Sequence, residues 1–94
     1  MSEFDNNIFS DKKSILLVAI GSVVARKRKE LNKGINKFSF EYDIGNGLLS
    51  RLENGTSEAK ISTLWKLANA FDMPFSEFAK LIEDELPVNF NFYE

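Results

Sequence analysis

The sequence contains no cysteine and no histidine, and this double absence excludes several classes of site. Without cysteine, the chain has no disulfides and no thiolate ligands for a metal. Without histidine, it lacks the commonest general base and the commonest metal ligand. The 5 glycines form no phosphate-binding loop, and no carboxylates cluster in an apolar setting. We therefore expect no enzyme activity, no metal site and no cofactor.

Long apolar runs are also missing. The longest, Ile15 to Ile20, is far shorter than the roughly 20 residues that a membrane-spanning helix needs. It follows an acidic opening segment and lies too far inside the chain to resemble a secretory signal. We therefore expect a single cytoplasmic domain with a small core and no membrane partner.

The formal net charge of −2 conceals an uneven distribution of charge along the chain. Residues 12–37 carry eight basic side chains against Glu30 alone, which gives a local charge of +7. Residues 61–94 carry two basic side chains against six acidic ones, which gives −4. Such a polarised chain can turn one end toward phosphate. From charge alone, ordinary solvation of helix surfaces explains the pattern equally well.

Apolar residues recur at helical spacing through most of the chain, which predicts an all-α fold. We expect five helices, of which the first runs from Lys12 to Leu31 and the third is the stretch 47–53, ended by Asn54-Gly55. Asp43, Ile44 and Gly45 are expected to form the tight connector before the third helix. The positions expected to face the core include Trp65, Phe71, Phe75 and Phe78, whereas Phe40 is expected on an outer side.

The chain divides into three expected regions. Residues 1–11 lack periodicity and are expected to be a flexible segment, and residues 12–85 form the domain. Residues 86–94 form a tail in which Val88 and Phe90 alternate with polar residues as in a strand. This tail is a candidate dimerisation strand, or it folds back on the core of its own chain.

The stretch GLLSRLENG, residues 47–55, has two different sides when it is placed on a helix. Leu49 and Leu52 share one side, with Leu48 at its margin. The opposite side carries Asn46, Gly47, Ser50 and Arg51. Arginine can bind guanine, and asparagine can bind adenine, through two hydrogen bonds in the major groove of DNA. A solvated surface helix would usually carry pairs of glutamate and lysine instead, so the pattern favours a DNA-reading helix.

Three segments of the chain together match a known pattern. They are IG followed by ARKRKEL in the first helix, LLSRLENG in the third, and ISTLWKLANAFDMPFSEF downstream. In these segments the chain, from about Ile20 to Leu81, resembles the phage-repressor and Cro-type helix-turn-helix domain, often called XRE-type. The resemblance implies an all-α, five-helix, lambda-repressor-like domain with its helix-turn-helix at the second and third helices.

The resemblance also implies roles for individual residues. The expected base-reading residues are Asn46, Gly47, Ser50 and Arg51. The expected phosphate-binding residues are Asn36 and Lys37 at the start of the second helix, and Asn54, Thr56, Ser57 and Lys60 after the third. An arginine late in the first helix pairs with the glutamate of the third in this family. By position these are Arg28 and Glu53, which are therefore expected to form a structural ion pair.

The chain departs from the family pattern at four positions. Ile35 stands where a glutamine commonly contacts phosphate, and Gly45 replaces the usual Ser or Thr cap of the third helix. Asp43 stands at a left-handed position that is usually glycine, a conformation that aspartate tolerates better than most residues. Gly47 replaces a side chain that often reads a base. Direct readout is therefore expected to depend mainly on Asn46, Ser50 and Arg51.

Together, these patterns predict a sequence-specific DNA-binding transcriptional regulator, a repressor that binds a two-fold symmetric operator in double-stranded DNA as a homodimer. Candidate dimer surfaces are the fifth helix and the tail. The alternative is a protein-interaction module that keeps the fold but has lost DNA binding, with a protein partner at the tail or at Phe40. The negative net charge, Ile35 and Gly47 favour this alternative, whereas LLSRLENG and the basic first helix oppose it.

Overall fold

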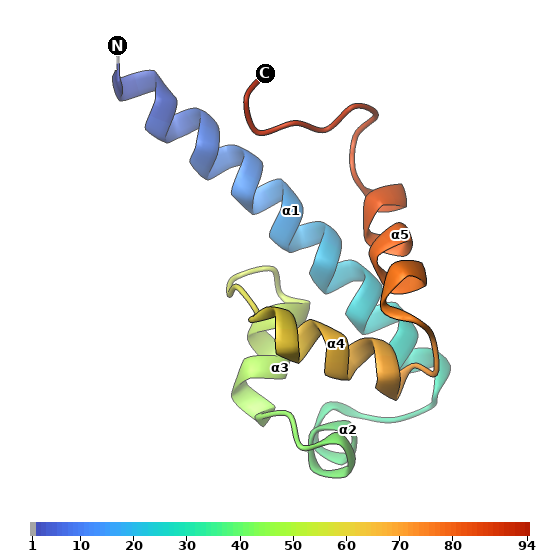
Figure 1. Ribbon diagram of the computed structural model, residues 1–94. Helices are drawn as coiled ribbons and strands as arrows, with labels where there is room; N and C mark the ends of the chain where they lie inside the picture. The colour runs from blue at the N-terminus through green and yellow to red at the C-terminus, as the bar shows by residue number, and fades with distance from the viewer. Residues whose placement is uncertain (1) are drawn as a thin grey trace.

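The computed structural model describes the backbone of residues 2–94 and the side chains of residues 9–94. It contains five helices, α1 (Ser2–Glu30), α2 (Ile35–Tyr42), α3 (Asn46–Glu53), α4 (Ile61–Ala70) and α5 (Phe75–Glu85), and no strand within this part of the chain. Helices α2, α3 and α4 gather near the C-terminal half of α1, whose first half extends away from them (Figure 1). Helix α1 contacts α3 and α5, α2 contacts α3, and α4 contacts α5. None of the described helices is long and apolar enough to cross a bilayer.

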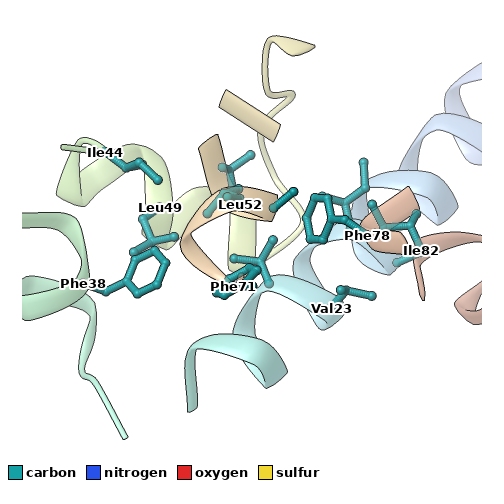
Figure 2. Packing of buried hydrophobic residues seen from close by; sticks show 13 residues of the cluster. Val23, Phe38, Ile44, Leu49, Leu52, Phe71, Phe78 and Ile82 are labelled. Carbon is teal, nitrogen blue, oxygen red and sulfur yellow. The ribbon is translucent and has the colours of Figure 1, made fainter. Parts of the chain in front are cut away.

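The core joins all five helices. The rings of Phe38 and Phe71 have their centroids 5.5 Å apart, and those of Phe71 and Phe78 are 6.0 Å apart. Figure 2 shows these rings beside Leu49 and Leu52, which come from α3. The buried apolar residues are Ala19, Ile20, Val23, Val24, Phe38, Ile44, Leu49, Leu52, Leu67, Ala68, Phe71, Phe78 and Ile82. Because each large side chain contributes about 1.5–3 kcal/mol when buried, this cluster is what fixes α3 on the domain.

The first helix begins earlier than the sequence pattern indicates. Residues 1–11 were expected to be irregular, but α1 starts at Ser2. The first half of α1 has long-range partners in the tail. The rings of Phe9 and Tyr93 meet edge to face with centroids 5.9 Å apart, and the Lys12 ammonium donates to backbone oxygens of Asn91 and Glu94. Helical periodicity cannot reveal such contacts, since they join opposite ends of the chain.

The tail, residues 86–94, is not a strand, contrary to the alternating pattern. Its extension is interrupted by a turn in which the Phe90 N–H donates to the Pro87 carbonyl, 3.1 Å away, and Asn89 has a φ of 61°. The tail then runs back toward the first half of α1 (Figure 1). The Lys12 ammonium lies 5.9 Å from the centroid of the Phe90 ring. In the single chain the end of the tail therefore lies against the first half of α1, and its role as a dimerisation strand stays a prediction.

Trp65 was expected in the core, and this prediction is wrong. Its side chain is 52% exposed and stacks on Phe75, with ring centroids 4.6 Å apart and planes 3° from parallel. The fully buried residues of α4 are Leu67 and Ala68. The buried stripe of α4 is thus rotated away from Trp65, which covers the partly buried Phe75 from outside.

Two left-handed residues shape the helix-turn-helix. Asp43 ends α2 with φ 54° and ψ 51°, the left-handed conformation expected for it, and its N–H donates to the carbonyl of Ser39. Gly55 follows α3 with φ 72°. The N–H groups of Gly55 and Thr56 donate to the carbonyls of Leu52 and Arg51, at 3.1 and 3.0 Å, which is the Schellman arrangement that closes a helix. Both turns therefore fix where α3 begins and ends.

Ser39 provides a test of the packing between α2 and its neighbours. Its hydroxyl is buried and has no hydrogen-bond partner among the described residues. We expect Ser39→Ala to raise the free energy of unfolding by about 1 kcal/mol, because it removes an unsatisfied polar group and adds a better helix former. Chemical denaturation measures the change. A loss of stability would mean that the hydroxyl has a partner in solution.

Candidate nucleic-acid interface

Helix α3 presents one apolar side and one polar side, as its sequence predicts. Leu49 and Leu52 are fully buried against the core. Asn46, Gly47 and Arg51 are exposed on the other side, and Ser50 is partly exposed. The four residues expected to read bases therefore share one accessible surface of α3.

Close backbone contact holds α3 against α1. A β-carbon at Gly21 would lie 2.3 Å from the Leu52 carbonyl oxygen and 2.8 Å from that of Glu53. A β-carbon at Gly55 would lie 3.1 Å from the Cα of Val18. Glycine at these positions lets α1 and the end of α3 approach more closely than side chains permit. The orientation of the outer side of α3 is fixed by this contact.

Arg28 and Glu53 join the same two helices, where the resemblance to repressors implies an ion pair. Arg28 donates from Nε and Nη2 to the two carboxylate oxygens of Glu53 at 2.6 and 2.8 Å, and each side chain is 9% exposed. A third donor, Nη1, binds the Lys33 carbonyl at 2.7 Å. The hydrogen bond to Glu53 raises the pKa of Arg28 above its ordinary value, against the opposing effect of burial. Arg28 is thus engaged inside the domain and is not available to DNA.

The Arg51 side chain lies along the outer surface of α3. Its Nε donates to the Ser57 hydroxyl at 3.2 Å, and the backbone carbonyl of Arg51 accepts from the Thr56 hydroxyl at 3.3 Å. Its Nη1 would be 3.1 Å from a β-carbon at Gly47. The guanidinium therefore lies between Gly47, at the start of α3, and the loop that follows α3.

The helices of the helix-turn-helix are also linked on their outer side. The amide nitrogen of Asn46 donates to the amide oxygen of Asn36, at the start of α2. Lys37 is exposed and forms no ion pair with the side chains that the structure describes. Ile35 stands where the family commonly has glutamine, and it packs against the core instead. Asn36 and Lys37, the residues expected to contact phosphate at this end, are both exposed.

The loop after α3 contributes exposed polar groups on the far side of Arg51. Asn54, Thr56 and Lys60 are exposed, and Ser57 is partly exposed. Helices α2, α3 and α4 have no side-chain cap and no acidic residue in their first turns. Free N–H groups at such helix starts favour anions. Uncapped helix starts thus accompany both expected phosphate-binding segments.

Most of the basic residues of the block 12–37 are neutralised by neighbours, which the sequence did not reveal. Lys13 pairs with Glu58, Arg26 with Glu85 and Lys27 with Glu30. The Lys33 ammonium lies 2.6 Å from the Glu41 carboxylate, and this hydrogen bond raises the pKa of Lys33 and lowers that of Glu41. Near α3, the basic side chains that form no ion pair with the described residues include Lys37, Arg51 and Lys60.

These features define a small all-helical protein of the helix-turn-helix class, in which a left-handed turn joins α2 to an exposed α3. A family model described as Helix-turn-helix, HTH_3, matches residues 24–78, more than half of the chain. The chain belongs to this family of DNA-binding regulators, in agreement with its resemblance to the Cro and phage-repressor type. No curated protein and no solved structure matches it.

Proposed function

We propose that this protein is a sequence-specific transcriptional repressor that inserts α3 into the major groove of its operator. The observation that carries the proposal is the outward side of α3, where Asn46, Ser50 and Arg51 lie opposite the buried leucines. An α-helix with its side chains is about 10–12 Å in diameter, which suits a groove about 12 Å wide. In this arrangement Arg51 binds guanine and Asn46 binds adenine.

The surroundings of α3 support this docking. Asn36 and Lys37 flank one end of α3, and the loop with Thr56 and Lys60 flanks the other, so the two DNA strands bordering the groove would each meet polar groups. Contacts to phosphate fix the position of a protein on the duplex, and contacts to bases supply the sequence preference. Both kinds of contact are available on one surface.

We further propose that the protein binds as a homodimer. One short helix reads only a few base pairs, and proteins of this class gain specificity from two half-sites about 34 Å apart. Candidate dimer surfaces are α5 and the tail, where Val88 and Tyr93 are exposed. We propose a cytoplasmic location, no enzyme activity and no cofactor, as suits such a regulator.

One observation favours a second candidate, a module that binds protein in place of DNA. The ring of Phe40, on the outer side of α2, is 88% exposed. The neutralised lysines of α1 also reduce the attraction to phosphate. Under this alternative, α3 binds no preferred sequence, and Phe40 or the tail contacts a protein partner.

Selection from a randomised duplex pool, followed by anisotropy titration, separates the two candidates. We expect the wild-type protein to enrich a two-fold symmetric sequence. Arg51→Ala should weaken binding to it by about tenfold or more per half-site, because a bidentate contact to guanine is lost. Arg26→Ala is the matched control, since it removes the same side chain from the α5-facing side of α1. Equal binding by both variants would contradict the role of α3.

A further inference from the structure

Gly47, which has no side chain, lies directly beside the guanidinium of Arg51. These residues are four apart on α3, so a side chain at position 51, which leans toward the start of the helix, passes over position 47. A β-carbon at Gly47 would lie 3.1 Å from Nη1 and 3.9 Å from Cζ of Arg51. No other described atom outside its immediate helix surroundings lies within 4 Å of that position.

Glycine is not required at position 47 by the backbone. Gly47 lies within α3, and its φ is not among the positive values found in the described chain. Glycine is a poor helix former, so an ordinary side chain would stabilise α3 if nothing opposed it. What glycine does provide at position 47 is space for the Arg51 guanidinium.

A second contact fixes the other end of the Arg51 guanidinium. Its Nε donates to the Ser57 hydroxyl at 3.2 Å. This hydrogen bond restrains the guanidinium at Nε, while Gly47 leaves room beside its Nη1 end. Nη1 and Nη2 form no hydrogen bond with the described residues and are available for a base. Such preorganisation reduces the side-chain entropy that is lost when a bidentate hydrogen bond forms.

We propose that Gly47 and Ser57 are positioning residues that orient Arg51 to read one guanine in each half-site, and that Gly47 itself contacts no base. The proposal rests on the proposed DNA-binding function and refines it. It gives Ser57 the role of orienting Arg51, whereas the resemblance to repressors alone implies that Ser57 contacts phosphate. Asn46, held by Asn36, is oriented by a separate pair and should read its base independently.

The test uses wild-type protein, Gly47→Ala, Arg51→Ala and the double variant. Each is titrated with the selected duplex and with a duplex in which one guanine of each half-site is replaced by adenine. We expect the wild type to discriminate between them by about tenfold or more per half-site. Gly47→Ala should lose a measurable part of this discrimination while keeping the preference at other base pairs and the salt dependence. In the Arg51→Ala background, the change at Gly47 should have no further effect on discrimination.

Two results would overturn the proposal while leaving DNA binding intact. One is undiminished guanine discrimination in Gly47→Ala. The other is that Gly47→Ala reduces guanine discrimination by the same factor in the wild-type and in the Arg51→Ala background. If the wild type selects no sequence, the proposed function fails as well, so the wild-type titration distinguishes the two failures. Thermal melting by circular dichroism verifies that each variant is folded.

Ser57→Ala provides an independent measurement. We expect a partial loss of discrimination at the same guanine, with the salt dependence of binding unchanged. If Ser57 served only as a phosphate contact, affinity would fall about uniformly across sequences. That outcome would overturn the positioning role of Ser57.

Discussion

Gly21→Ala is expected to lower the free energy of unfolding by about 3 kcal/mol, at the upper end of the 1–3 kcal/mol that overpacking against rigid atoms typically costs. The added β-carbon would lie 2.3 Å from the carbonyl oxygen of Leu52 and 3.0 Å from the carbonyl carbon of Glu53. These are backbone atoms, so they cannot rotate away as a side chain can. Alanine is otherwise favoured over glycine in a helix by about 1 kcal/mol, and the clash must exceed that gain. Urea denaturation followed by circular dichroism measures the difference.

Gly47→Ala is the matched control for stability. It makes the same chemical change within a helix, but the new β-carbon would approach only the flexible end of Arg51. We expect the free energy of unfolding to stay the same or to rise by about 0.5–1 kcal/mol. Similar losses in both variants would show that the close approach of α1 to α3 is not what Gly21 provides.

Arg28→Met is expected to lower the free energy of unfolding by about 3–5 kcal/mol, the typical cost of removing one partner from a buried ion pair. The substitution leaves the Glu53 carboxylate, 9% exposed, without its two charged donors, and it removes the donor to the Lys33 carbonyl. Because the folded state raises the pKa of Arg28, the stabilisation is fully present below the ordinary arginine value. It is lost only as the pH rises through the higher folded value. The free energy of unfolding lost in Arg28→Met should therefore be the same at neutral and at moderately alkaline pH, as measured by denaturant titration.

Two further variants identify the origin of this effect. Arg28→Met combined with Glu53→Met should recover a large part of the lost stability, since an unpaired buried charge is no longer present. Arg26→Ala removes an arginine whose partner, Glu85, is also partly exposed, and should cost about 1 kcal/mol or less. If the double variant were as unstable as Arg28→Met, the cost would come from lost packing and not from the unpaired carboxylate.

The helices of the domain could be predicted from the sequence because their cause is local. Apolar residues spaced for a helix produced α2, α4 and α5 near their observed positions, and Asn54-Gly55 marked the end of α3. The aspartate at position 43 was expected to be left-handed and is so. Each of these features depends on residues that are close together in the chain, so the printed order of residues contains the necessary information.

Features with a long-range cause were not predictable. The early start of α1 accompanies contacts between Phe9 and Tyr93, at opposite ends of the chain. The exposure of Trp65 follows from how α4 is rotated on its neighbours, because positions 64, 65 and 68 are all compatible with one side of a helix. The sequence shows a block of positive charge, but not that Lys13 of this block pairs with Glu58.

The sequence predicted which residues lie on the outer side of α3, but not which hydrogen bonds they form. The order of residues on α3 identified the side opposite Leu49 and Leu52. It did not show that Arg51 binds Ser57 or that Asn46 binds Asn36, since each pair joins α3 to another segment. From the sequence alone, Gly47 is a position where a base-reading side chain is missing. The structure adds the position of the Arg51 guanidinium beside it.

The most direct test of the account is the salt dependence of binding by the wild-type protein to its selected duplex, compared with a scrambled duplex. We expect saturable binding to the selected duplex, with the logarithm of the association constant falling by about 0.9 per neutralised phosphate for each tenfold rise in salt. We also expect preference for the selected duplex to persist at the higher salt. Equal, weak binding to both duplexes that moderate salt abolishes would contradict the account and show that the fold serves a different partner.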